Sequence, residues 1–172
     1  MSVAVCDSGP ITHLWQIQQW TAFAALDELH AARQVIDEVR SHVPMEQFAV
    51  YAGSSLQVHE IDQVEVGQTR NALTEGSKLQ DADIATIVLA KQLTPALVLT
   101  DDLTLRRTLE SFGLTPMGSV GLVLRAYATN RLTRSQLQQA IDGLFVQSTL
   151  YLSPVFKTFV QREVEQLLRE SR

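Results

Sequence analysis

Acidic residues directly follow the two clearest strand patterns in this sequence. The apolar residues 3–6 end at Asp7, and the apolar residues 95–100 end at Asp101 and Asp102. Short apolar runs bounded by turn-forming residues are typical of buried strands. In open parallel sheets, ligands bind beyond the carboxyl ends of the strands. If both strands belong to one such sheet, these carboxylates lie at a single ligand-binding edge.

Two more acids, Glu38 and Asp83, lie in segments with helical patterns. Convergence of all these acids would be costly, because two carboxylates about 4 Å apart repel each other by roughly 4 kcal/mol at an effective dielectric of about 20. A folded protein tolerates such repulsion when a cation neutralises it or when one carboxylate binds a proton. Oxygen ligands without a Cys/His set at metal-ligand spacing favour Mg²⁺ or Mn²⁺ over Zn²⁺.

A carboxylate site of this kind suits the hydrolysis of phosphodiesters. A bound metal polarises the phosphoryl oxygens and lowers the pKa of a coordinated water, so no nucleophilic side chain is needed. Each acid also has a structural interpretation: Asp7 as a helix cap, Asp83 as a first-turn residue, Asp101 and Asp102 as turn formers, and Glu38 as an exposed helix residue. Surface acids outnumber catalytic ones, and it is the joint pattern that favours the metal site.

Hydrophobic patterning predicts strands that alternate with helices. Strands are expected at residues 3–6, 56–61, 95–100 and 115–118, with a shorter one hidden in 30–33. Helices are expected at residues 11–18, 20–29, 34–41, 45–51, 66–76, 81–92, 103–112, 120–129, 133–144 and 153–170. This alternation predicts a three-layer α/β/α fold with a central parallel sheet. We expect a single domain over residues 1–172, with its core at about 1–120 and a helical C-terminal extension at about 120–172.

Four segments carry a recognisable series of motifs, at residues 3–8, 35–39, 82–90 and 98–102. They are an apolar strand followed by Asp and Ser, a helix carrying Glu, an acid at the head of an Ala-rich helix, and a strand ending in Thr followed by acids. In this order they resemble the PIN-domain superfamily over about residues 3–118. One subgroup, similar to the toxin ribonucleases of prokaryotic toxin–antitoxin pairs, has counterparts of residues 118–122 and of the segment from 132–133 to 153–154.

The resemblance implies a ribonuclease that depends on Mg²⁺ or Mn²⁺. Carried over residue by residue, its metal-binding acids would be Asp7, Glu38, Asp83 and Asp102, with Asp101 as the alternative to Asp102. Ser8 and Thr100 would orient these acids by hydrogen bonding. Two positions depart from the subgroup, since Asp83 stands where Glu is usual and Ala82 where Gly is common. The shorter Asp side chain leaves room for reduced metal affinity or activity.

Three polar residues and one apolar stripe have alternative interpretations. Arg106 and Arg107 lie on the helix after the last acids, where they either contact RNA phosphates or form a solvated helix face. His13, about one helical turn after Asp7, is interpreted as a structural or surface residue, with an approach to the acidic site as the alternative. Residues 155–168 carry an amphipathic stripe, expected to pack on the core, with a cover over the cleft or an interface as alternatives.

Net charge, hydrophobic runs and cysteine content limit the classes of protein to which this chain can belong. The net charge of −5 opposes tight non-specific binding to nucleic acid, unless the acids converge on a metal that inverts the local charge. No apolar run is long enough to span a bilayer, and the first residues lack the basic region of a secretory signal. The single cysteine, Cys6, cannot form an internal disulfide. We therefore expect a cytoplasmic protein without a membrane partner.

The combined interpretation is an endoribonuclease that hydrolyses the phosphodiester bonds of single-stranded RNA. A toxin role is implied by the resemblance alone; its antitoxin would be a separate chain, and a homodimer is compatible with it. The alternative is a catalytically silent PIN-like module that binds RNA or another protein. A haloacid-type phosphatase is disfavoured because the chain has Asp7-Ser8-Gly9 instead of Asp-x-Asp, and a receiver domain because no Lys follows residues 115–118.

Overall fold

The central feature of the fold is a parallel β-sheet. The structure is a computed structural model that describes residues 2–53 and 55–170. Within these residues, five strands pair in the order β3-β2-β1-β4-β5, and every pair is parallel. The strands are β1 (Val3–Cys6), β2 (Glu28–Ala32), β3 (Leu56–His59), β4 (Leu97–Leu99) and β5 (Pro116–Met117).

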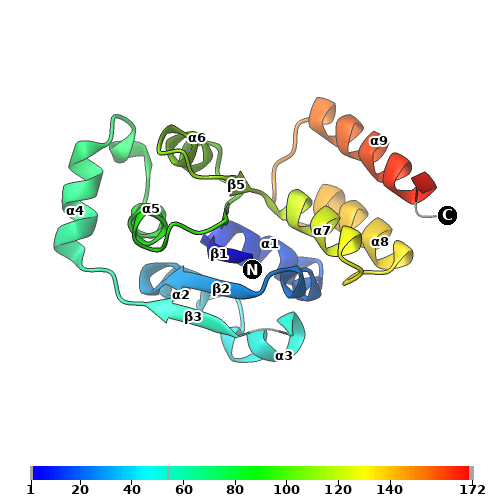
Figure 1. Cartoon of the computed structure of the whole chain (residues 1–172), viewed down its shortest axis with the longest axis horizontal. Helices are drawn as coiled ribbons and strands as arrows, with labels where there is room; N and C mark the ends of the chain where they lie inside the picture. Colours follow the sequence, from blue (N-terminus) through cyan, green and yellow to red (C-terminus); the bar gives the residue numbers. More distant parts are fainter. Residues whose placement is uncertain (1, 54, 171–172) are drawn as a thin grey trace.

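Helices cover both faces of this sheet (Figure 1). Helix α5 packs on β1 and β2 with α4 beside it, whereas α1, α7 and the 3-10 helix η1 pack together on the other face. The predicted three-layer α/β/α fold is therefore confirmed. The helices are α1 (Ser8–Gln16), η1 (Trp20–Ala25), α2 (Arg33–Val39), η2 (Met45–Gln47), α3 (Phe48–Ala52), α4 (Gln63–Ala72), η3 (Gly76–Lys78), α5 (Asp81–Leu93), α6 (Leu103–Ser111), α7 (Ser119–Ala128), α8 (Arg134–Val146) and α9 (Pro154–Glu170).

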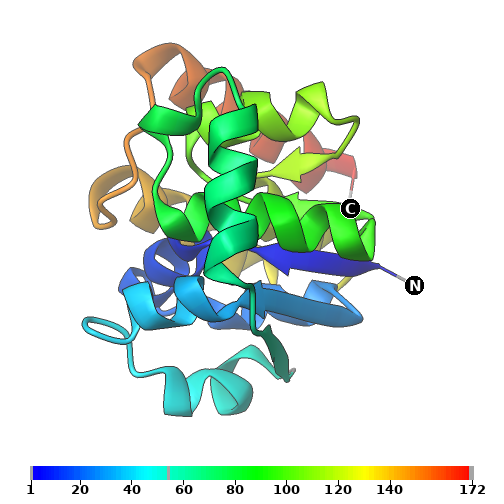
Figure 2. The ribbon, with the colours of Figure 1, turned by 90° about the vertical axis from the view of Figure 1, so that its left-hand side faces the viewer.

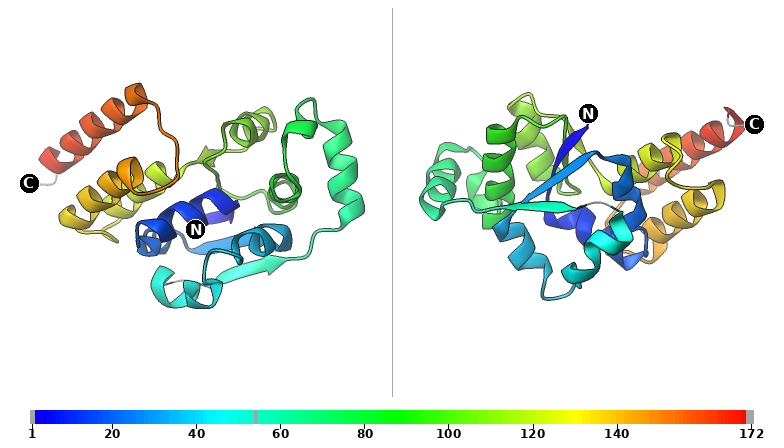
Figure 3. Two further views of the ribbon diagram at one scale, coloured as in Figure 1. Left: turned by 180° about the vertical axis from the view of Figure 1, so that it is seen from behind. Right: turned by 60° about the horizontal axis from the view of Figure 1, so that its bottom comes forward.

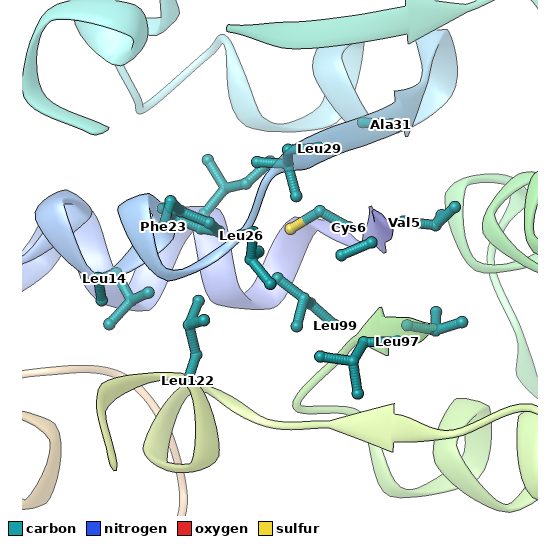
Figure 4. Close-up of a cluster of buried hydrophobic side chains, with 14 of the residues drawn as sticks. Val5, Cys6, Leu14, Phe23, Leu26, Leu29, Ala31, Leu97, Leu99 and Leu122 are labelled. Atoms are coloured by element: carbon teal, nitrogen blue, oxygen red, sulfur yellow. The ribbon is translucent and has the colours of Figure 1, made fainter. Parts of the chain in front are cut away.

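Alternate residues of the central strand β1 build the core on the two faces of the sheet. Val5 points toward the α5 side, while Cys6 points toward Phe23 and Leu26 on the other side (Figure 4). Val5 and Cys6 are fully buried. Apolar side chains on both faces of a strand are typical of parallel sheets with two helical layers, which explains why residues 3–6 are a continuous apolar run.

The strand order reverses direction between β1 and β4, and this reversal places the ends of the two strands side by side. The backbone N–H of Asp7 donates to the carbonyl of Leu99 at 2.9 Å, so the pairing continues past the end of β1. In Figure 2 the arrows of β1, β2 and β5 point toward the side of the molecule where the connection between α8 and α9 lies. Ligand sites of open parallel sheets form at such a reversal.

The helix expected at residues 20–29 is wrong at its C-terminal end. Residues 20–29 form the 3-10 helix η1 only to Ala25, and strand β2 then begins at Glu28. The Leu- and Ala-rich segment has a helical pattern locally, but β2 pairs along β1, with Val5 opposite His30. Tertiary pairing overrides local propensity here. The short strand suspected at 30–33 is therefore the second half of β2.

The C-terminal helix α9 buries one side and exposes another. Val160, Val164 and Leu168 are buried at helical spacing, whereas Phe156 and Phe159 remain exposed. Helix α9 lies beside α8, at the end of the molecule farthest from α4, in both views of Figure 3. The expected packing of the 155–168 stripe thus holds for part of that stripe. None of the described helices is both long and apolar enough to cross a membrane.

Candidate functional site

A single cavity at the carboxyl end of the sheet collects the acids that the sequence singled out. Its volume is about 1020 Å³, toward the upper end of the size typical of ligand sites. The walls include all five predicted acids, which come from four separate parts of the chain: Asp7, Glu38, Asp83, Asp101 and Asp102. The fold thus brings together carboxylates that lie far apart in sequence.

Asp7 is the most buried of these acids, with 3% of its surface exposed. Its Oδ2 accepts a hydrogen bond from the Thr100 hydroxyl at 3.0 Å, while its Oδ1 has no hydrogen-bond partner among the described residues. Burial, followed by the nearby Asp83 carboxylate, raises the pKa of Asp7 to about 8. A buried carboxylate oxygen without a partner is rare, because its desolvation is not compensated. Such an atom suits a site where a cation binds.

Thr100 connects the two strand ends beneath the cavity. Its fully buried hydroxyl donates to Asp7 and accepts the backbone N–H of Asp102 at 3.1 Å. One side chain therefore fixes both the Asp7 carboxylate and the start of α6. This contact is the one that the orienting role predicted for Thr100 requires. Ser8, the other residue predicted to orient an acid, is half-buried in the cavity wall.

Asp83 and Asp102 each combine a place in the cavity wall with a helix-capping role. Asp83 Oδ2 accepts the backbone N–H of Gln80 at 2.7 Å, as part of a capping box at the start of α5. Asp102 is the N-cap of α6, where its Oδ1 accepts the backbone N–H of Leu105 at 2.6 Å. Burial, together with the Asp102 and Glu38 carboxylates, raises the pKa of Asp83. The structural interpretation of these acids is therefore correct, and it coexists with their position in the cavity.

Asp101 has a different environment from its neighbour. Its Oδ1 accepts the backbone N–H of Ser119 at 2.7 Å, and its Oδ2 lies 2.5 Å from Ser119 Oγ and 2.7 Å from His13 Nδ1. The carboxylate thus joins α1 to the first turn of α7. A Cβ on Gly118 would lie 2.9 Å from Asp101 Oδ1, so a residue without a side chain is needed at this contact. Since both its oxygens already have partners, Asp101 fits a metal less well than Asp102 does.

The carboxylate oxygens in the cavity are ligands of the type that a hard divalent cation prefers. Their arrangement, however, does not converge on a single point. Among the residues described, no three Asp, Glu, His or Cys side chains form a ready-made metal cluster. One oxygen of Asp83 and one of Asp102 are engaged in capping, and Glu38 is exposed at the end of α2. Mg²⁺ is commonly held by one or two carboxylates together with water and substrate phosphates. Asp7, with its unpartnered oxygen, meets that requirement.

The two arginines on α6 differ in position. Arg106 is half-buried and lines the cavity, whereas Arg107 is exposed and is not part of the cavity wall. Of the two predicted RNA contacts, Arg106 is therefore the better placed. His13 also lines the cavity and contacts Asp101, which agrees with the alternative that it approaches the acidic site.

The C-terminal part of the chain adds a wall to the cavity. The sequence offered a cover over the cleft as an alternative for the 155–168 stripe, to which Phe156 belongs, but it missed residues 149–153. Residues 149–153 and Phe156 line the cavity, although they lie far along the chain from Asp7 and Glu38. The motif at residues 118–122 was the sequence signal from which the contact between Ser119 and Asp101 could have been anticipated. No spacing pattern in the sequence indicates that residues 149–153 lie at this edge of the sheet.

Comparison with known families agrees with this geometry. A family model described as a PIN domain matches residues 3–166, nearly the whole chain. The chain therefore belongs to the PIN-domain family, as the resemblance in its motifs predicted. PIN domains are generally nucleases, and they generally use divalent metals. No curated protein is significantly similar to this chain.

Proposed function

We propose that this protein is an endoribonuclease that hydrolyses single-stranded RNA with the help of Mg²⁺ or Mn²⁺. The observation that carries the proposal is Asp7: a buried carboxylate, with one oxygen unpartnered, at the strand-order reversal and in a cavity shared with four other acids. An acidic cavity repels a phosphodiester unless a cation is present. The arrangement is thus better suited to metal-assisted hydrolysis than to direct anion binding.

Asp7, Asp83, Asp102 and Glu38 are the residues that would hold the metal. When bound, the cation would polarise the phosphoryl group and acidify a water molecule. Thr100 keeps Asp7 oriented by donating to its Oδ2, and this leaves Oδ1 for the cation. Arg106 is placed to pair with a phosphate that enters the cavity.

The direct test is cleavage of a labelled single-stranded RNA with Mn²⁺ or Mg²⁺ by the wild type and by Asp7→Asn. We expect the wild type to cleave and Asp7→Asn to lose at least about 100-fold in rate, because removing the charge of a metal ligand weakens transition-state stabilisation by several kcal/mol. Asp142→Asn is the matched control, since Asp142 is exposed on α8 and contacts Gln138. Equal rates for wild type and Asp7→Asn would point to a contaminating nuclease and contradict the proposal.

A second function, an inactive RNA-binding or protein-binding module, is favoured by one observation. The described residues hold no ready-made cluster of three metal ligands. The two proposals differ in their response to Mn²⁺, because the inactive module would bind RNA without cleaving it. A wild type that binds RNA equally with EDTA or Mn²⁺, and leaves it intact, would support this second function.

The toxin role is a separate part of the proposal and is based on the resemblance to toxin ribonucleases. Expression of the wild type would then arrest growth, and expression of Asp7→Asn would not. Co-expression of a separate antitoxin chain would relieve the arrest. Unimpaired growth during expression of an enzyme that cleaves RNA in the assay would leave the ribonuclease proposal intact and remove the toxin role.

A further inference from the structure

We infer that Tyr151 and Phe156 form a base-stacking subsite for single-stranded RNA beside the carboxylate cavity. This inference rests on the proposed ribonuclease function and names where the substrate bases bind. Both residues belong to the C-terminal part of the chain, and both line the same cavity as Asp7 and Asp83.

The connection between α8 and α9 holds this subsite in place. It runs along the carboxyl end of the sheet (Figure 2). Gln16 of α1 accepts the backbone N–H of Thr149 at 2.8 Å and also contacts the Thr149 hydroxyl at 3.2 Å. On α9, Lys157 donates to the carbonyl of Phe145 at 2.8 Å. Both ends of the segment that carries Tyr151 are therefore held by neighbouring helices, α1 at Thr149 and α8 at Lys157.

The aromatic rings at this side of the cavity are exposed to solvent. Tyr151 is 84% exposed and Phe156 is 40% exposed, and Phe159 stacks beside Phe156 with ring centroids 6.2 Å apart. Exposed apolar side chains gathered at a cavity often mark a binding site. Because every nucleobase has a flat π face, aromatic side chains can stack on bases without requiring a particular sequence.

The charge of the cavity favours a base-directed contact over a phosphate-directed one. Among the described residues that line it, Arg106 is the one Lys or Arg, compared with five acids. The whole chain carries a net charge of −5. Affinity for the RNA backbone must therefore be weak away from the bound cation, and the bases offer the remaining binding surface. In duplex RNA the bases are already stacked, so the subsite selects a single strand.

The experiment measures binding of a labelled single-stranded RNA in Ca²⁺, with an abasic strand of equal length as the second probe. We expect Tyr151→Ala and Phe156→Ala each to weaken binding of the normal strand roughly tenfold. Binding of the abasic strand should be unchanged by either substitution. Tyr151→Phe and Phe156→Tyr should retain wild-type affinity because they keep the ring. Tyr51→Ala is the matched control, since Tyr51 is 54% exposed on α3, outside the cavity wall.

Salt dependence provides a second, independent readout. A base-stacking contact predicts that the affinity of the wild type falls only shallowly as salt rises. The alanine variants should keep this slope and lose affinity by the same factor at every salt concentration, because they remove no phosphate contact. Equal affinity of wild type and both alanine variants, or equal losses for normal and abasic strands, would overturn the inference. So would an effect of these variants on self-association without an effect on RNA, because the aromatic side chains would then contact a second copy.

The outcomes separate this inference from the proposed function. If the wild type leaves RNA uncut in Mn²⁺ but binds it through Tyr151 and Phe156, hydrolysis is refuted and the subsite is supported. If Asp7→Asn loses cleavage while Tyr151→Ala and Phe156→Ala cleave with the KM of the wild type, hydrolysis is supported and the subsite is refuted.

Discussion

The Thr100 hydroxyl donates to Asp7 Oδ2 at 3.0 Å, across a separation of 93 residues in sequence. This hydrogen bond joins the ends of β1 and β4 at the point where the strand order reverses. It fixes one oxygen of the buried carboxylate. The other oxygen, Oδ1, has no hydrogen-bond partner among the described residues. Through Asp7, and through the backbone N–H of Asp102, Thr100 thus connects two of the acids that line the cavity.

Replacing Thr100 tests that hydrogen bond. Thr100→Val keeps the shape of the side chain but leaves Asp7 Oδ2 without its donor, so we expect a loss of about 1–3 kcal/mol in the free energy of unfolding. Urea unfolding measures this change. Thr100→Ser, which retains the hydroxyl, should lose less. A Thr100→Val variant as stable as the wild type and equally active would show that the contact is dispensable.

The stability of the metal-free protein should depend on the ionisation of Asp7. Burial raises the pKa of Asp7 from 3.8 to about 8 in the folded state, so the folded protein holds a proton that the unfolded chain has already released. The free energy of unfolding should therefore fall as pH rises from about 4 to about 8. Asp7→Asn, which cannot ionise, should flatten this dependence and raise stability near pH 8. Urea unfolding in EDTA at several pH values measures both effects.

Addition of Mn²⁺ provides the corresponding check on the same pH dependence. A cation at Asp7 favours the ionised carboxylate, so the wild type should regain stability near pH 8 while Asp7→Asn should not. An identical response of the two proteins to Mn²⁺ would argue against metal binding at Asp7.

Asp101 should have a structural role and Asp102 a role in metal binding. Asp101→Asn disturbs the contacts with His13 and Ser119, and we expect it to lower the free energy of unfolding by about 1–3 kcal/mol. Asp102→Asn should cost little stability, because Asn is an equally good N-cap, but it should weaken Mn²⁺ binding and RNA cleavage. Thermal unfolding and Mn²⁺ titration, run on both variants, distinguish the roles. The opposite pattern would make Asp101 the fourth ligand.

Gly118 should not tolerate a side chain. A Cβ there would lie 2.9 Å from Asp101 Oδ1 and 3.3 Å from Arg106 Nη2, so Gly118→Ala should destabilise the protein by about 1–3 kcal/mol. Gly67→Ala is the control, since a Cβ on this α4 residue meets nothing within 4 Å. That substitution should stabilise the protein by about 0.5–1 kcal/mol through the better helix propensity of Ala. Equal effects at both positions would contradict the predicted crowding.

The sequence by itself determined the family and the chemical character of the site. The apolar run before Asp7 and the run before Asp101 are local patterns, and they predict strands that end in acids without knowledge of the fold. The order of the motifs was enough to indicate a PIN domain, which the family match over residues 3–166 confirms. The central parallel sheet follows from the same alternation of strands and helices.

Tertiary structure decided the features that depend on long-range pairing. Glu28–Ala32 became a strand because β1 offers it a parallel partner, which outweighs the helical propensity of its residues. The distinction between Asp101 and Asp102 came from Ser119 and His13, which approach only when α1 and α7 pack together. Tyr151 reaches the cavity for the same reason, since no local pattern encodes contacts between residues so far apart along the chain.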